Sequence, residues 1–289
     1  VDQQRHPGVG RGHEVGPHLA AGLLPIAVLS QLESNGSLLA FLLFNDAIQD
    51  WDHHLGTLTD FWSSVMLTTG RYRGDPFSAH LRLPGIDPAL CDRWRPGVTM
   101  LPATDDRLET HVVVDVGGER KAVHFQEWWV RYRGDVPTHR FVFVGAEAAK
   151  PATGVLEAIG AADVVLVAPS NPVVSIAPIL AVPQLREAVA GGPAPVVGVS
   201  PIIGGAPVRG MADRCLATLG VEVSATGVGT LYGARSRDGL LDGWLVDASD
   251  AAADVPGVTV RSVPLWMTDE AATAKMVAEA IDLGREVAA

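Results

Sequence analysis

The sequence predicts an α/β protein: a Rossmann-like parallel sheet flanked by helices, with an inserted region made of a β-hairpin and a helical segment. Two observations lead to this prediction. Residues 163–219 contain two copies of one unit. In each copy a short apolar strand leads into a turn with serine and proline, and a helix follows. The strands also lack polar alternation, which is typical of parallel sheets buried on both faces. Alternating strands and helices favour a sheet covered by helices.

The first unit has its strand at residues 164–168 and its turn at 169–172. Ser170 or Asn171 can cap the following helix through a side-chain oxygen. Pro172 suits a first helical position, where its missing N–H costs nothing. The candidate ligand-binding residues of this unit are therefore Ser170, Asn171 and Pro172.

The second unit has its strand at residues 196–199, a turn at 200–205, and a predicted helix at 208–219 that ends at Gly220. The paired glycines of this turn would allow a ligand to approach the backbone closely. Arg209 or Arg214, which lie near the turn, could add positive charge, although most arginines are simply solvated. The candidate binding residues here are Ser200, Pro201, Gly204, Gly205 and Arg209.

The position of both turns predicts an anionic ligand. In open parallel sheets, ligands sit beyond the carboxyl ends of the strands. Free N–H groups at helix starts favour an anion there by about 0.3–1 kcal/mol. A phosphorylated ligand fits both conditions. Either turn alone also occurs in α/β proteins for the sole purpose of starting a helix, so the pair is more informative than each member.

Composition narrows the classes of partner. The chain has 289 residues, a net charge of −11 and 47% hydrophobic residues. It can bury a large core, and its negative charge disfavours nucleic acid or an anionic membrane as a partner. Two cysteines, Cys91 and Cys215, do not suggest a disulfide framework or a metal knuckle. Because no long apolar run or signal-peptide pattern stands out, we expect a cytoplasmic protein without a transmembrane helix.

An inserted region is predicted at residues 112–133. Two apolar stretches flank Gly117-Gly118, which predicts a β-hairpin. The following "HFQEWWVRYR" run, residues 124–133, gathers aromatic rings and arginines. A ring such as Trp128 could stack on a planar ligand, and a guanidinium such as that of Arg131 could meet phosphate. Trp128 and Trp129 could equally be core and rim residues.

The remaining segments continue the α/β pattern. The last helix is predicted at residues 270–283, capped by Thr268, with Ala271, Ala274, Val277 and Ile281 on its buried face. Other predicted helices are 151–159 and 224–232, and other predicted strands are 138–144, 240–246 and 258–263.

Three strings resemble one family: "APSNPVVSI" at 168–176, "PVVGVSPIIGG" at 195–205 and "GMADRCL" at 210–216. The chain resembles the 2-phospho-L-lactate transferases of deazaflavin coenzyme biosynthesis, the CofD family, from about Ala89 to its end. The resemblance implies transfer of a phosphoenolpyruvyl or 2-phospholactyl group from a guanosine diphosphate-type donor to the deazaflavin Fo. The products would be GMP and coenzyme F-420-0 or its dehydro form. It also implies magnesium as a cofactor and small molecules as the partners.

The resemblance stops upstream of residue 85. Residues 1–85 contain neither the family's glycine-rich loop nor its Asn-x-Gly-Asp-Asp stretch, so the chain divides into an atypical segment 1–85 and a CofD-like domain 86–289. A frameshifted start joined to an authentic remainder is one hypothesis for this pattern. Metal ligands and a catalytic nucleophile are left unassigned. Acids and histidines at residues 46–54, and Asp105, Asp106 and Glu109, could bind a metal or could be solvated surface.

Two alternatives stay open. The chain could be a non-catalytic CofD-like binder of nucleotide sugars, or a relative that has lost activity with the glycine-rich loop. The sequence also leaves the oligomeric state open, with a homodimer as one option.

Overall fold

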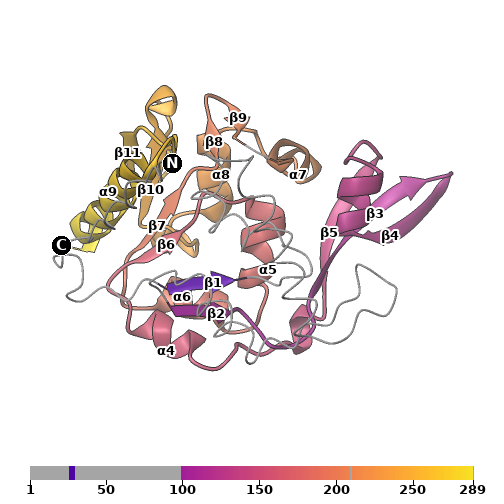
Figure 1. Cartoon of the computed structure of the whole chain (residues 1–289), viewed down its shortest axis with the longest axis horizontal. Helices are drawn as coiled ribbons and strands as arrows, with labels where there is room; N and C mark the ends of the chain where they lie inside the picture. Colours follow the sequence, from indigo (N-terminus) through magenta and orange to yellow (C-terminus); the bar gives the residue numbers. More distant parts are fainter. Residues whose placement is uncertain (1–25, 30–98, 209, 289) are drawn as a thin grey trace, which may run out of the picture.

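The structure is a computed structural model, and it describes residues 26–29, 99–208 and 210–288. Its centre is a four-stranded sheet of β6 (Val165–Val167), β7 (Val196–Val199), β10 (Gly243–Asp247) and β11 (Thr259–Val263). The strand order is β11-β10-β7-β6, and every neighbouring pair is parallel. Helices flank this sheet (Figure 1). The predicted α/β class with a helix-covered parallel sheet is therefore confirmed.

Parallel strands require crossover connections, and most of these carry helices. The crossover from β6 to β7 holds the helical turn η5 (Pro172–Ile176), α5 (Ala177–Leu180) and α6 (Leu185–Gly191). That from β7 to β10 holds α7 (Ala212–Thr218) and α8 (Ala225–Tyr232). Before β6 lies α4 (Val155–Gly160), and α9 (Glu270–Ala288) ends the described chain.

Two apolar layers cover the two faces of the sheet. Along β10, Trp244 and Val246 belong to one buried cluster, whereas Leu245 between them belongs to another. Successive side chains of a strand point to opposite faces, which explains this alternation. The cluster of Leu245 includes Met276 and Leu283 of α9. This helix therefore covers one face, while α7 and α8 contribute to the cluster on the other.

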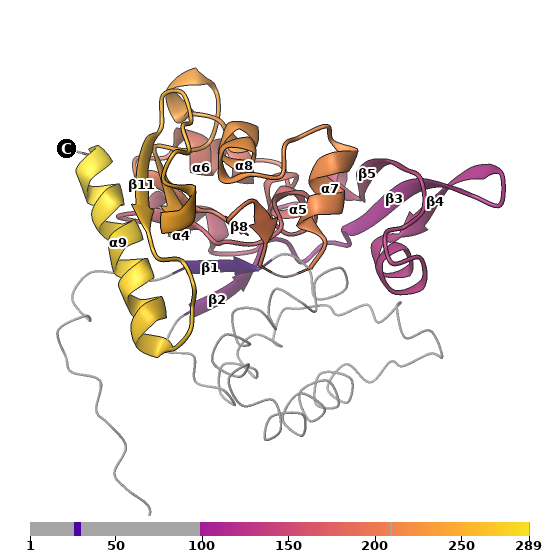
Figure 2. The ribbon, with the colours of Figure 1, turned by 90° about the horizontal axis from the view of Figure 1, so that it is seen from above.

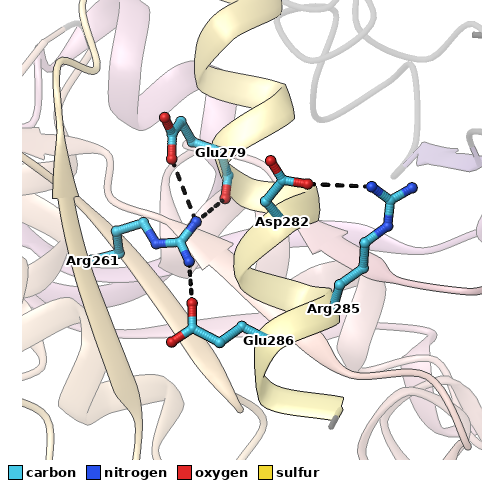
Figure 3. Close-up of polar contacts among 5 residues, drawn as sticks. All are labelled: Arg261, Glu279, Asp282, Arg285 and Glu286. Carbon is cyan, nitrogen blue, oxygen red and sulfur yellow. Dashed lines mark hydrogen bonds and ion pairs between the residues drawn. The ribbon is translucent and has the colours of Figure 1, made fainter.

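Helix α9 is also held by charge (Figure 3). The guanidinium of Arg261 on β11 donates to the backbone carbonyl of Glu279 at 3.1 Å, and it pairs with the carboxylates of Glu279 and Glu286. A second pair, Arg285 with Asp282, lies along the helix and is exposed. Only the first network joins two elements.

The C-terminal helix differs from its prediction in its end, its cap and its buried face. It runs to Ala288, beyond the predicted end at residue 283. Its first turn is capped by Asp269, whose carboxylate accepts from the backbone N–H of Ala272 at 2.7 Å, so the prediction of a Thr268 cap was wrong. The predicted buried face was wrong as well. Met276, Ala280 and Leu283 are buried, whereas Val277 is exposed. The spacing of small alanines could not define the face, because contacts with the sheet decide which stripe is covered.

An antiparallel sheet forms a second unit from β3 (Glu109–Val116), β4 (Glu119–His124) and β5 (Thr138–Val144), in the order β4-β3-β5. Gly117 and Gly118 form the turn of the β3–β4 hairpin, both with positive φ. This confirms the predicted hairpin. The helical turn η3 (Glu127–Arg131) follows β4. Figures 1 and 2 show β3 and β4 projecting away from the parallel sheet and its helices.

Smaller elements complete the described chain. Strand β1 (Ile26–Leu29) pairs in parallel with β2 (Thr99–Pro102). Strands β8 (Ile202–Ile203) and β9 (Ala206–Pro207) form a short hairpin directly after β7. Single helical turns are η4 (Ala146–Ala148), η6 (Arg235–Arg237) and η7 (Ala248–Asp250). The helix predicted at 208–219 begins only at Ala212 and follows Gly210, whose φ of +76° lies outside the right-handed helical region.

Candidate functional site

The two predicted turns lie at the same edge of the sheet. Strands β6 and β7 are paired in parallel, with Val167 opposite Gly198. Ser170 follows the end of β6 by three residues, and Ser200 follows the end of β7 by one. Because parallel strands end on the same side, both turns reach the carboxyl edge, where ligands of open α/β sheets bind.

The first turn is built as a helix cap. The side-chain oxygen of Asn171 accepts from the backbone N–H groups of Val173 at 2.9 Å and Val174 at 3.3 Å, and Pro172 follows at the first helical position. The predicted cap is therefore confirmed for Asn171 rather than Ser170. Ser170 is only 7% exposed, and its hydroxyl has no recorded partner among the described residues. This hydroxyl therefore fits the expected role of Ser170 as a ligand-binding residue.

The other end of the Asn171 amide contacts a cysteine. Its Nδ2 donates to Sγ of Cys215 on α7, at 3.4 Å. Cys215 is fully buried, and this burial is the main reason why its pKa is raised to about 12. The thiol is therefore protonated at neutral pH and is not a reactive thiolate.

The second turn satisfies its own polar groups. The Ser200 hydroxyl donates to the carbonyl of Ile202 at 2.9 Å and accepts from the Ile202 N–H at 3.1 Å. Both Ser200 and Pro201 are buried. The Ser200 side chain thus shapes the turn, a role that the serine-proline pattern could not distinguish from ligand binding.

Gly204 and Gly205 form the two-residue turn of the β8–β9 hairpin. Their φ angles are +60° and +78°, which glycine adopts without strain. Both residues are exposed. The Gly204 N–H donates to the Asp250 carboxylate at 2.8 Å. The glycines are therefore explained by turn geometry, and this N–H already has an anionic partner within the chain.

Sequence reasoning assigned no role to two acids at the same edge, Asp247 at the end of β10 and Asp250 in the loop that follows. Asp247 is buried, and its carboxylate accepts from the Ser249 N–H at 3.0 Å, the Ser249 hydroxyl at 2.7 Å and the Leu265 N–H at 2.9 Å. Burial alone would raise the pKa of Asp247, but these hydrogen bonds outweigh it and the pKa is lowered.

Asp247 and Asp250 connect three loops at this edge: Asp250 holds the β8–β9 hairpin, and Asp247 holds the segment after β11. A sequence pattern could have identified Asp247: an acidic residue at the end of an apolar run that forms a buried strand.

The aromatic run after β4 is partly core. Trp128 is 0% exposed; its indole N–H donates to the Thr138 hydroxyl at 2.9 Å, and its ring contacts Phe125 and Phe141. A fully covered ring has no free face, so the structure gives Trp128 a packing role rather than the stacking role we expected. Trp129 is only partly buried.

The candidate arginines are dispersed. Arg131 is exposed and pairs with Glu127 at 2.9 Å on its own helical turn. Arg209 lies outside the described residues. Arg214, on α7, donates to the Arg133 carbonyl at 2.7 Å and pairs with Asp135. Arg131 and Arg214 therefore already have polar partners within the chain.

The described part of the chain offers no group of three or more His, Cys, Asp or Glu side chains that could hold a metal ion. Asp106 accepts from the Lys150 N–H, and Glu109 pairs with Arg107 and His111. Burial and the neighbouring Asp106 raise the pKa of Asp105. The acids and histidines at residues 46–54 lie outside the described residues.

Among the described helices, none is by itself long and apolar enough to cross a membrane. The helical segments at residues 172–180 and 185–191 are together long and apolar enough to span a membrane, but they meet at an angle of 92°. The helical turn η5 of the first segment belongs to the protein core, where Val173, Val174 and Ile176 are buried.

The sheet and its edge turns define a Rossmann-like α/β protein with a candidate ligand site at the carboxyl edge. Residues 84–281 match the family described as 2-phospho-L-lactate transferase CofD, which is more than half of the chain. The chain therefore belongs to the CofD family of transferases, as its three diagnostic strings predicted.

Several relatives are each named "Phosphoenolpyruvate transferase". The protein from Nocardia farcinica is 57% identical over 220 residues, covering 75% of this chain and 66% of the relative. That from Streptomyces coelicolor is 58% identical over 232 residues, covering 79% and 70%. That from Mycobacterium tuberculosis is 56% identical over 224 residues, covering 77% and 67%. The aligned part thus spans about two thirds of the length of these relatives.

Among solved structures, a member of the UPF0052 family from Bacillus halodurans is similar with 18% identity and a TM-score of 0.42. That match covers 66% of this chain and 64% of the other.

Proposed function

We propose that this protein transfers a phosphoenolpyruvyl group from a guanosine diphosphate-type donor to the deazaflavin Fo, releasing GMP and forming dehydro coenzyme F-420-0. The observation that carries this proposal is the 56–58% identity to relatives named phosphoenolpyruvate transferase. The family match at 84–281 includes both edge turns, the parallel sheet and the antiparallel sheet. Transfer of a 2-phospholactyl group is the variant that the same family description suggests.

In this reaction the side-chain hydroxyl of Fo attacks the donor phosphorus that carries the three-carbon unit. A new P–O bond forms, the bond to the bridging oxygen of GMP breaks, and the hydroxyl proton is released. Such transfer depends on in-line positioning and on neutralising the charge of the transferred group. The protein's main task is therefore to hold the Fo hydroxyl in line with the phosphorus and the leaving oxygen of the diphosphate.

The edge turns have distinct roles in the proposal. The Ser170 hydroxyl, which has no recorded partner among the described residues, donates to the diphosphate. Asn171 and Ser200 shape the two turns through the hydrogen bonds that they already make. Pro172 and Pro201 fix the backbone beside them. Gly204 and Gly205 keep the hairpin free of side chains, so a ligand can pass close to its backbone.

Arg131 and Arg209 are proposed as sources of positive charge for the anionic donor. Arg131 is exposed, so its pairing with Glu127 is readily exchanged for a stronger anion. Trp128 supports the site only through packing, because its ring is fully covered.

Magnesium belongs to the proposal as a cofactor that would neutralise phosphate charge. The residues that the structure describes provide no ligand set for it. No step is therefore assigned to the metal, and its requirement is a matter for the assay.

The experiment is to mix the full chain with Fo and the guanosine diphosphate-linked phosphoenolpyruvate donor, with magnesium or with EDTA, and to follow GMP and the deazaflavin product by chromatography. We expect GMP and product in equal amounts, only with magnesium. A chain that binds the donor without releasing GMP is the non-catalytic binder instead. That alternative is suggested by residues 1–83, which lie outside the family match. Comparing donors with phosphoenolpyruvate and with phospholactate identifies the three-carbon unit.

A further inference from the structure

We propose that Cys215 is a positioning residue for the donor site, because its contact with Asn171 fixes the turn that carries Ser170. This inference rests on the function proposed above, and it assigns a task to a buried thiol that the reaction itself does not use. The residues involved come from two elements, α7 and the start of η5, which pack against each other in the core.

The Asn171 amide is held at both ends. Its oxygen accepts from two backbone N–H groups of η5, and its Nδ2 donates to Sγ of Cys215. A rotated amide would point Nδ2 at the N–H of Val173, which places donor against donor. The helix start therefore selects one orientation of the amide, and the sulfur limits its remaining movement.

Cys215 is suited to this task because it cannot move or ionise easily. It is fully buried, and burial raises the pKa of its thiol to about 12. A protonated thiol keeps a weak acceptor without introducing a charge. A thiolate here would attract the amide more strongly, but burial disfavours the charged form.

Helix α7 is itself anchored at the adjacent residue. Arg214 donates to the backbone carbonyl of Arg133 and pairs with Asp135, both in the segment between η3 and β5. Neighbouring residues of α7 thus contact the inserted antiparallel region and the turn after β6. Through this helix, the position of Asn171 is tied to an element that lies far from it along the sequence.

The consequence for the site concerns Ser170. It precedes Asn171 directly and is 7% exposed, so a small displacement of the cap covers or redirects its hydroxyl. Loss of the sulfur contact should weaken binding of a diphosphate more than it weakens the fold.

The test compares Cys215→Ala with Leu216→Ala in the full chain. Leu216 is the next residue of α7 and is equally buried. Its truncation therefore removes a buried side chain of the same helix but leaves the contact between Asn171 and Cys215 in place. We expect Cys215→Ala to raise the Kd for GDP, measured by calorimetry, about threefold to tenfold, a size typical of coupled neighbouring groups. Leu216→Ala should lower Tm by at least as much but leave this Kd within about twofold of wild type. Cys215→Ser, which keeps an acceptor, should restore the Kd.

Equal effects of the two alanine variants on GDP binding would overturn the proposal, as would a Kd unchanged in Cys215→Ala. A second readout is the side-chain amide signal of Asn171 in NMR spectra. It should shift and lose exchange protection in Cys215→Ala and remain in place in Leu216→Ala. An unmoved signal contradicts the positioning role.

The outcomes separate this inference from the proposed function. Wild-type protein that binds GDP but never releases GMP from the phosphoenolpyruvyl donor would refute the transferase proposal. The comparison of Kd values for GDP would still decide the role of Cys215. If wild-type protein binds no GDP, the Asn171 signal decides the role of Cys215, and GMP release from the donor still decides the transferase proposal.

Discussion

Replacing Asp247 with asparagine tests whether a buried carboxylate holds together the loops at the site. Asp247 accepts three hydrogen bonds, two from Ser249 and one from the Leu265 N–H. An asparagine amide has one acceptor end and one donor end. If its oxygen faces Ser249, its NH₂ faces the Leu265 N–H; if it is rotated, its NH₂ faces the Ser249 N–H. One backbone N–H loses its acceptor in either orientation.

The expected loss follows from these bonds. A buried donor without a partner costs about 1–3 kcal/mol, and hydrogen bonds to a charged acceptor are stronger than those to a neutral one. We therefore expect Asp247→Asn to lower the free energy of unfolding by about 2–4 kcal/mol at pH 7. A loss near 3 kcal/mol corresponds to a decrease in Tm of roughly 6–12 °C. Urea unfolding and calorimetry measure both quantities.

The same carboxylate gives the effect a pH dependence. Because the pKa of Asp247 is lowered in the folded state, its contribution is complete above the unfolded value of about 3.9. It is lost as the pH falls through the lower folded pKa. The difference between wild type and Asp247→Asn should thus be largest at neutral pH and should shrink as the wild-type carboxyl is protonated.

The matched control is Asp250→Asn. Among the described residues, the Asp250 carboxylate accepts a hydrogen bond from the exposed Gly204 N–H alone, and the amide oxygen of the asparagine can keep this bond. We expect a loss below about 1 kcal/mol. Equal unfolding free energies for Asp247→Asn and wild type at pH 7 would refute the reasoning, since the Leu265 N–H would then have another acceptor.

Three further changes test other parts of the structure. Gly198→Ala would place its Cβ 2.6 Å from the Trp244 ring, so we expect a loss of about 1–3 kcal/mol in urea unfolding; a stable variant would show that the ring can shift. Gly204→Val imposes a φ near +60° on a branched residue, at a cost of about 1–3 kcal/mol, and should reduce GMP release; full activity would exclude contact between this turn and the substrate. Arg261→Ala removes the tether of α9 to β11 and should lower Tm clearly, whereas Arg285→Ala, in an exposed pair worth about 0–1 kcal/mol, should not; equal effects would contradict the network in Figure 3.

The chain's strand and turn patterns were sufficient to predict several elements. The apolar runs at β6 and β7, the Asn171 cap and the Gly117-Gly118 hairpin are all present in the structure. Each depends on local physics. A run of buried apolar residues, a side-chain cap or a positive φ acts within a few residues of the sequence. The domain boundary near residue 85 and the proposed ligand contacts stay predictions.

Sequence patterns could not decide what the polar groups of the site bind. Serine, asparagine and glycine after a strand suit a ligand site and a helix start equally well. The structure shows that the Ser200 hydroxyl bonds within its own turn, and that the Asn171 amide reaches Cys215, which lies 44 residues away in the sequence. A partner 44 residues away is set by packing, so the contact of the Asn171 amide is known only once the chain is folded.

The sequence by itself therefore determined the α/β class, the family and the placement of both turns at one edge of the sheet, since these follow from local periodicity and from matched strings. Only the tertiary structure decided that Trp128 is covered and that Asp247 links two loops. It also decided which stripe of α9 is buried. Burial and long-range hydrogen bonds depend on which surfaces meet, and the meeting of surfaces is a property of the whole fold.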